Sequence, residues 1–112
     1  MGLKDKVLGT FDRATKKVHV PEWDVTLTVC ELGLEEGLLL AEMYGTGEKV
    51  SLTGRDIAQV VAWGVLDENG DRMFADEDVA GLSKKSRHAL MRLFTEISQL
   101  SAAGAFEEAE KN

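Results

Sequence analysis

The sequence predicts an α+β domain: an N-terminal β-hairpin, helices packed around it, a second small β-hairpin at Asn69-Gly70 and a long C-terminal amphipathic helix. The first hairpin follows from apolar and polar residues that alternate with period two between residues 23 and 29. The long helix follows from apolar residues at helical spacing between residues 90 and 100. We divide the chain into a loosely ordered segment at residues 1–17, a single domain at 18–104 and a frayed acidic tail at 105–112.

The first hairpin is expected to pair residues 18–20 with the strand that follows Pro21. In that strand Val25, Leu27 and Val29 alternate with polar residues, so one face should be buried, and the β-branched content fits a strand. Pro21 belongs to the turn, where its missing N–H does no harm. Trp23 is expected to join the core at the start of the strand rather than a binding site.

Two helices should follow this hairpin. The first covers residues 32–44 and is apolar over a wide arc, so part of its cover is expected to come from another chain. The second helix begins at Thr53, which forms a capping box with Asp56, while Leu52 and Ile57 form a hydrophobic staple.

Residues 67–78 permit two interpretations. Asp67, Asn69, Asp71 and Asp78 stand at positions 1, 3, 5 and 12 of a calcium-binding loop, which makes them weak candidate metal ligands. A calcium loop needs glycine at position 6, where this chain has Arg72, and a cation there would also repel the ion. Asn69-Gly70 between apolar pairs is instead typical of a type I′ hairpin turn, which we favour.

The C-terminal third is expected to be helical. Asp76 should cap a short helix that ends near Gly81, Ser83 should cap the long helix, and Gly104 should end it. The apolar face of the long helix consists of Leu90, Leu93, Phe94, Ile97 and Leu100, of which Leu90, Leu93 and Ile97 are assigned to the core.

Composition restricts the classes of function. The net charge of −7 argues against a nucleic-acid partner, because phosphate binding depends on clustered lysine and arginine. No apolar run is long enough to span a membrane, and the first residues lack the apolar stretch of a signal peptide. Cys30 is the single cysteine, which fits a reducing cytosol. His19 and His88 stand on different elements without a nucleophile at a recognisable elbow, so we expect neither an enzyme nor a cofactor.

Two sequence patterns add a resemblance. V-P-E-W-x-V-x-L-x-V-x-E-L at residues 20–32 and D-E-N-G-D-R-M-F-A-D-E-D-V-A-G-L-S-K-K-S-x-x-A-L-x-R-L at residues 67–93 resemble the tail assembly chaperones of long-tailed (siphovirus-type) bacteriophages and prophages. The ending E-E-A-E-K-N is also similar to that family. The chain departs from the usual pattern at Gly33 and Gly37, where a capping hydroxyl and a better helix former are typical. The resemblance therefore does not predict the geometry of the first helix or the surface that it presents.

The resemblance implies a protein of the host bacterial cytoplasm that is absent from the mature virion. Such a chaperone binds the tape-measure protein, keeps it soluble and helps recruit tail-tube subunits; a frameshifted longer form of the chain and a homo-oligomer are further possible partners. An apolar helical client requires exposed apolar side chains on a soluble body. The candidates on this chain are Leu38, Leu39, Leu40 and Met43, with Trp63, Met91 and Phe94 as second choices.

Two alternative functions remain open from the sequence. A head–tail joining or tail-completion protein would form a ring that stays in the virion. A calcium-binding module would gain stability from Ca²⁺, and Asp67→Ala would abolish that gain.

Overall fold

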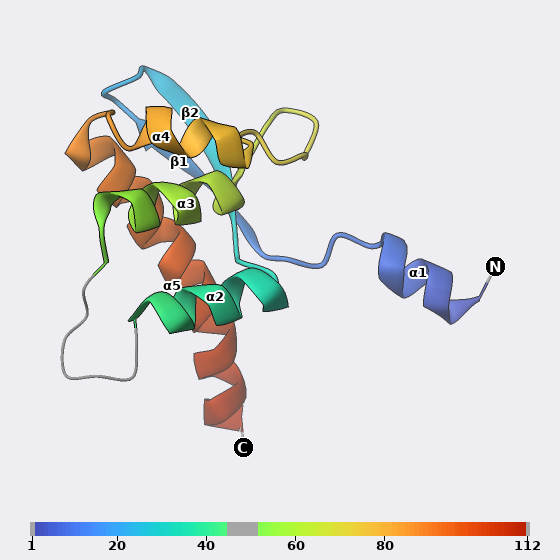
Figure 1. The fold of residues 1–112 in the computed structure, drawn as a ribbon. Helices are drawn as coiled ribbons and strands as arrows, with labels where there is room; N and C mark the ends of the chain where they lie inside the picture. The colour runs from blue at the N-terminus through green and yellow to red at the C-terminus, as the bar shows by residue number, and fades with distance from the viewer. Residues whose placement is uncertain (1, 45–51, 112) are drawn as a thin grey trace.

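Three antiparallel strands form one sheet in the order β1-β2-β3, and a long helix, α5, packs across it (Figure 1). The computed structural model describes the backbone of residues 2–44 and 52–111 and the side chains of residues 2–42 and 52–101. Its elements are α1 (Leu3–Gly9), β1 (Thr15–Val20), β2 (Val25–Cys30), α2 (Leu34–Tyr44), α3 (Gly54–Gly64), β3 (Val65–Leu66), the 3₁₀ turn η1 (Asp76–Asp78), α4 (Val79–Leu82) and α5 (Arg87–Lys111). The predicted α+β class, the N-terminal hairpin and the long C-terminal helix are confirmed.

The predicted pairing of residues 18–20 with the strand after Pro21 is confirmed, and its register places Val18 opposite Leu27 and Val20 opposite Val25. Strand β1 begins earlier than residue 18, because the pairing continues to Thr15 opposite Cys30. Two adjacent lysines in this part of the strand hid it from the apolar alternation. The turn ends at Asp24, whose φ of 52° lies in the left-handed region that aspartate tolerates better than most residues.

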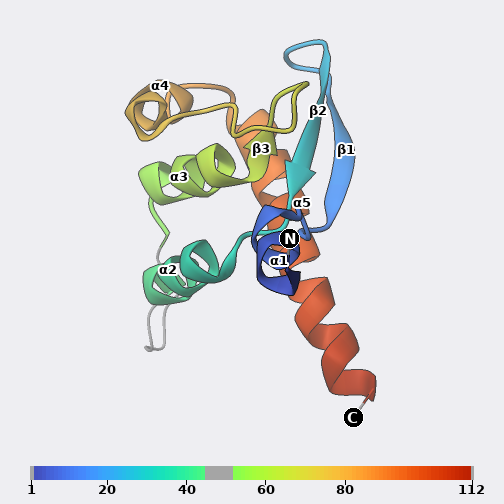
Figure 2. The same cartoon turned by 90° about the vertical axis from the view of Figure 1, so that its right-hand side faces the viewer.

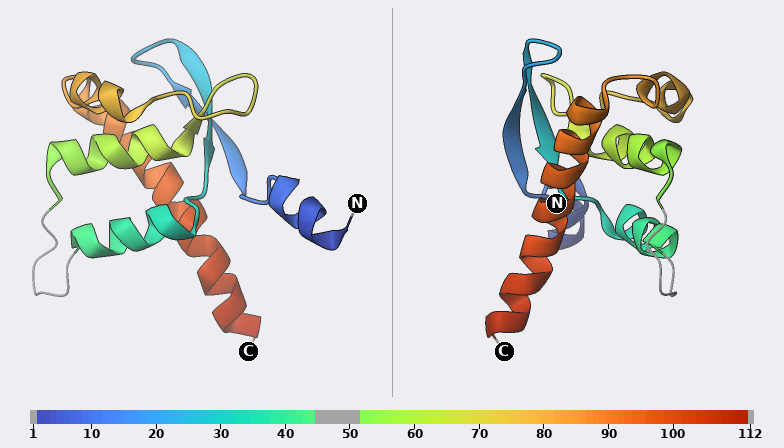
Figure 3. Two further views of the ribbon diagram at one scale, coloured as in Figure 1. Left: turned by 45° about the vertical axis from the view of Figure 1, so that its right-hand side comes forward. Right: turned by 90° about the vertical axis from the view of Figure 1, so that its left-hand side faces the viewer.

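Helix α5 separates the sheet from the other helices: the sheet lies on one side of it, and α2, α3 and α4 are stacked on the other (Figure 2). The right-hand view of Figure 3 shows the same arrangement from the opposite side. Leu90, Leu93 and Ile97 are buried as predicted, at 5%, 0% and 0% exposure. The same buried core includes Val60 and Val61 of α3 and Val18, Val20 and Val29 of the sheet.

Ion pairs tie the first hairpin to α5. Lys16 of β1 pairs with Glu96, and Glu22 in the hairpin turn accepts a hydrogen bond of 2.6 Å from Nη1 of Arg92. The Glu22 backbone N–H and then the Arg92 guanidinium hold the pKa of the Glu22 carboxyl below its usual value.

This lowered pKa predicts a pH-dependent contribution to folding. A carboxyl whose pKa is lower in the folded state contributes stability above its unfolded pKa, and loses that contribution as the pH falls through its folded pKa. The free energies of unfolding of wild type and Glu22→Gln should therefore differ at neutral pH and converge in acid, measured by urea titration at a series of pH values. In a protein that carries Arg92→Gln, the stability difference caused by Glu22→Gln at neutral pH should be smaller but not zero, because the Glu22 backbone N–H still lowers the pKa of the carboxyl. A stability difference between wild type and Glu22→Gln that stays constant down to the lowest pH would contradict this contribution of the Glu22 carboxyl.

Local sequence signals locate α3 correctly and α2 approximately. The predicted capping box is present, with Thr53 Oγ1 accepting from Asp56 N at 3.1 Å and Asp56 Oδ2 accepting from Thr53 N at 3.0 Å. Helix α2 begins at Leu34 rather than at residue 32, because Leu32 is buried and its N–H donates to the Ser101 hydroxyl of α5 at 3.0 Å.

The second hairpin is shorter than predicted. Its return arm consists of one bridge between Leu66 and Arg72, although β3 does pair with β2. The prediction of a type I′ turn was wrong: within the described ranges 2–44 and 52–111, Asp24 is the one non-glycine residue with positive φ, so Asn69 does not adopt it. Gly70 alone does, at 84°, and its N–H donates to the Asp67 carbonyl at 3.0 Å.

Three predicted ends of helices were also wrong. The Asp78 carboxylate caps the 3₁₀ turn through the Ala75 N–H at 2.8 Å, which leaves Asp76 free to pair with Arg72 at 2.7 Å. Helix α5 begins at Arg87, and the serine whose hydroxyl lies 3.4 Å from Ala89 N is Ser86 rather than Ser83.

The helix then continues past Gly104 to Lys111, since a single glycine disfavours a helix by only about 1 kcal/mol. Helix α1 stands inside the segment that we expected to be loosely ordered. The division of the chain at residues 17 and 104 stays a prediction.

Candidate functional site

Helix α2 carries four of the predicted partner-binding residues, and the structure separates them. Leu38 and Leu39 are 60% and 42% exposed, whereas Leu40 is buried in the core. Consecutive helical residues are about 100° apart, so Leu40 faces the core while Leu38 faces away from it. The side chain of Met43 lies outside the described residues.

The other three predicted residues do not extend this surface. Phe94 is buried and Trp63 is half-buried against the core. Met91 is 37% exposed, but it lies near the start of α5, whereas the start of α2 is attached to α5 at Ser101. These two points are roughly three helical turns apart, or about 15 Å. Met91 and the α2 leucines therefore belong to different parts of the surface.

On α2, Leu34 is an exposed apolar residue that the sequence analysis did not select. It is 83% exposed and stands one turn before Leu38, so the two side chains lie about 40° apart around the helix and form one apolar strip. We call Leu34 and Leu38 the α2 ridge. The spacing of four residues was visible in the sequence, but the exposure was not, because three neighbouring leucines compete for the core-facing position.

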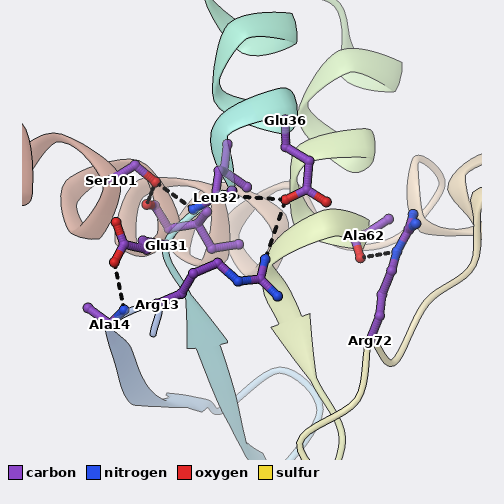
Figure 4. A network of polar contacts seen from close by, with 10 residues as sticks. Arg13, Ala14, Glu31, Leu32, Glu36, Ala62, Arg72 and Ser101 are labelled. Atoms are coloured by element: carbon purple, nitrogen blue, oxygen red, sulfur yellow. Dashed lines mark hydrogen bonds and ion pairs between the residues drawn. The ribbon is translucent and has the colours of Figure 1, made fainter. Parts of the chain in front are cut away.

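A network of polar contacts fixes the start of the ridge (Figure 4). The Leu32 N–H donates to Ser101 Oγ at 3.0 Å, and that hydroxyl donates to the Ile97 carbonyl at 2.9 Å. Glu36 Oε1 accepts from Gly33 N at 3.2 Å, which supplies one half of a capping box where Gly33 has no hydroxyl of its own. These bonds set the position of α2 relative to α5, and thereby the direction in which the ridge points.

The segment before β1 is attached to the same place. Glu31 Oε1 accepts from Ala14 N at 2.7 Å, and Arg13 Nη1 lies 3.5 Å from Glu36 Oε1 (Figure 4). A groove of about 560 Å³ lies beside the ridge. It is lined by Arg13, Gly33, Leu34, Glu35, Glu36 and Leu38. The ridge is thus an apolar strip with acidic neighbours, close to the point where the N-terminal segment leaves the domain.

A larger hollow of about 1160 Å³ lies over the sheet and the loop after β3. Its lining combines apolar side chains, including Trp23, Leu27, Met73 and Phe74, with threonines and Lys17 of the strands and the acidic turn at residues 67–70. The most exposed large apolar residues of this hollow are Phe11 and Val25, at 49% and 39%. Leu34 and Leu38 are more exposed, at 83% and 60%, and we therefore take the α2 ridge as the candidate surface for an apolar partner.

The candidate calcium ligands form a turn. Asp67 Oδ1 accepts from Asn69 N at 2.9 Å and from Asp71 N at 3.0 Å, so the backbone already uses this carboxylate. Arg72 donates from Nε to the Ala62 carbonyl at 3.0 Å, which fixes it against α3 (Figure 4). Among the side chains that the structure describes, no three His, Cys, Asp or Glu residues come together as a metal site.

The turn predicts the effect of Asp67→Ala. Loss of an acceptor for two backbone N–H groups should lower the free energy of unfolding by about 1 kcal/mol. The loss should be equal in calcium and in EDTA, measured by urea unfolding, and Asp67→Asn should restore part of it. If calcium raises the free energy of unfolding of the wild type but not of Asp67→Ala, the result would support the calcium-binding alternative.

The fold is similar to a known one. No protein-family model matches the chain, and no curated protein sequence matches it. Among solved structures, that of the bacteriophage HK97 tail assembly chaperone matches with a TM-score of 0.59. The match covers 88% of this chain and 91% of that one, at 19% sequence identity. The similarity of the fold therefore agrees with the family resemblance noted in the sequence. None of the described helices is both long enough and apolar enough to cross a bilayer.

Proposed function

We propose that this chain is a tail assembly chaperone that binds the tape-measure protein of its phage or prophage through the α2 ridge. It keeps this long helical client soluble in the host cytoplasm, helps recruit tail-tube subunits and is absent from the mature virion. The observation that carries the proposal is the exposure of Leu34 and Leu38, 83% and 60%, on a fold shared with the HK97 chaperone.

The physical chemistry of the ridge supports an apolar helical client. Burial of one fully exposed leucine contributes about 1.5–3 kcal/mol, so two adjacent leucines supply a substantial part of a micromolar affinity. Residues four apart on α2 can contact residues at the same spacing on a client helix. The net charge of −7 keeps a protein with such a strip soluble before the client arrives.

The test is co-expression of this chain with the tape-measure protein of its own phage, with soluble client and co-purified complex as the readouts. Leu38→Asp, alone and with Leu34→Gln, should abolish the recovery of a soluble complex. Substitution of Leu40 would not serve, because Leu40 is buried and a charge there would unfold the domain.

Met91→Asp is the matched control, since Met91 is an exposed apolar side chain on a different part of the surface. It should leave client recovery at the wild-type level, and circular dichroism should show that all variants fold. Equal client recovery by Leu38→Asp and wild type would remove the ridge from the proposal. An insoluble client in every case would argue against the chaperone function. Detection of this chain in purified virions would instead favour a head–tail joining protein.

A further inference from the structure

Helix α1 is an apolar helix that the rest of its own chain does not cover. Leu3, Val7 and Leu8 are 81%, 68% and 75% exposed, and none of the seven residues of α1 is buried by the part of the chain that the structure describes. The helix projects away from the sheet and the helical stack (Figures 1 and 3). A helix of this length is marginal in water on its own and gains its stability from packing. Its apolar face therefore requires a surface to cover it.

The α2 ridge matches that face in spacing and in charge. Leu3 and Val7 stand four residues apart on α1, as Leu34 and Leu38 do on α2, so each helix presents two apolar side chains one turn apart. Lys4 and Lys6 follow directly on either side of the α1 strip. The α2 ridge has carboxylates along one side instead, from Glu35 and Glu42. The two surfaces are complementary in their apolar residues, leucine against leucine or valine, and along one side in charge, lysine against glutamate.

We propose that α1 of one copy packs on the α2 ridge of a second copy, and that the exchange is reciprocal. The contacts of Arg13 with Glu36 and of Ala14 with Glu31 hold the end of the N-terminal segment beside the ridge of its own domain. Each copy therefore sends out its α1 from the place where it receives the other. Arg13 also lies over the Phe11 ring, 5.0 Å from its centroid, and the segment before it leads away from the domain (Figure 1).

Reciprocity follows from the size of the contact. A contact made by two helical turns on each side buries less surface than the roughly 1,000 Å² that a stable protein interface buries. Exchange of both α1 helices doubles the buried area and makes the second contact intramolecular, which raises the overall affinity well above that of one contact. The symmetric pair also covers all exposed leucines of both ridges, so the assembly closes at two copies.

The pairing gives the ridge a second occupant. Helix α1 then occupies the client-binding surface until the client displaces it. This role of α1 rests on the proposed function, whereas the pairing of the two copies does not. A chaperone whose apolar strip is covered by its own N-terminal helix would avoid aggregation before the client is made.

Oligomeric state in the absence of any client tests the pairing. Light scattering with size-exclusion chromatography should find a dimer for the wild-type chain and for the control Met91→Asp. Val7→Asp and Leu38→Asp should each raise the dimer dissociation constant about tenfold or more, at unchanged thermal unfolding. Glu35→Lys and the pair Lys4→Glu/Lys6→Glu should each weaken the dimer, and their mixture should restore it. A monomeric wild type, or a dimer unaffected by Val7→Asp, would overturn the pairing.

Cross-linking distinguishes exchange between copies from closure within one copy. Full-length Val7→Cys, labelled with ¹⁵N, is mixed with unlabelled Leu38→Cys and oxidised. A disulfide between a labelled and an unlabelled peptide, found by mass spectrometry, is expected for the exchanged helix. In the double variant Val7→Cys/Leu38→Cys, a disulfide confined to monomers would show that α1 covers its own ridge, and would overturn the proposal.

The client assay separates the two proposals. Val7→Asp should still solubilise the tape-measure protein, because it removes the competing helix and leaves the ridge intact, whereas Leu38→Asp should lose both the dimer and the client. A dimer that depends on Val7 together with an insoluble client would support the pairing and contradict the proposed function. Loss of client binding in Val7→Asp would show that α1 contacts the client, and would contradict its role as a stand-in.

Discussion

Gly64→Ala should destabilise the fold by about 2 kcal/mol. Gly64 is the last residue of α3, and a Cβ built there would lie 2.5 Å from Cδ1, 2.8 Å from Cγ1 and 2.9 Å from Cγ2 of Ile97 on α5. Ile97 is fully buried, so its side chain could clear the new Cβ only by moving into close-packed neighbours. Overpacking of this kind costs about 1–3 kcal/mol, against the gain of up to about 1 kcal/mol from replacing a helical glycine. Urea unfolding, with the midpoint and slope both recorded, measures the result.

Gly37→Ala in α2 is the matched control. Nothing lies within 4 Å of a Cβ at Gly37, so the same substitution there should raise the free energy of unfolding by up to about 1 kcal/mol. A double-mutant cycle of Gly64→Ala with Ile97→Ala should show coupling, because the smaller side chain makes room for the new Cβ. Equal effects of alanine at Gly64 and Gly37 would mean that α3 and α5 do not approach as closely as described.

This close approach illustrates what sequence reasoning could not supply. Gly64 is separated from Ile97 by more than thirty residues of chain, and nothing local distinguishes it from an ordinary helix-ending glycine. The capping box of Thr53 and Asp56, in contrast, was predictable because both partners lie within one turn. The start of α5 was missed for a related reason: Ser83 and Ser86 are equally good caps locally, and the packing of Leu82 and Ala89 in the core selects Ser86.

The candidate site was predictable in part. The sequence indicated that α2 has more apolar surface than its own core contact requires, and exposed Leu38 and Leu39 agree with that expectation. Which leucine faces the core depends on how α2 is rotated, and the Leu32–Ser101 hydrogen bond, between residues far apart in the sequence, sets that rotation. Leu34 became a candidate, and Leu40 a core residue, only when this contact was known.

Leu93→Ala should lower the free energy of unfolding by about 3 kcal/mol, more than Gly64→Ala. Leu93 is fully buried on α5 and belongs to the core that the sheet and α3 share. Replacement of a buried leucine by alanine removes its transfer free energy and leaves a cavity that close-packed neighbours fill only partly, which costs about 2–5 kcal/mol. Since single domains are stable by only about 5–15 kcal/mol, this variant should unfold at much lower urea concentration.

Met91→Ala, two residues earlier on the same helix, is the control for this variant. Its side chain is 37% exposed, so its truncation should change the free energy of unfolding by less than about 0.5 kcal/mol. The contrast also bears on function, because α5 is the support to which α2 and the first hairpin are attached. Leu93→Ala should therefore lose client recovery together with folded structure, whereas Leu38→Asp should lose client recovery alone. If Leu93→Ala unfolds at the wild-type midpoint, α5 is not the centre of the core, and the position assigned to the α2 ridge would have to be abandoned as well.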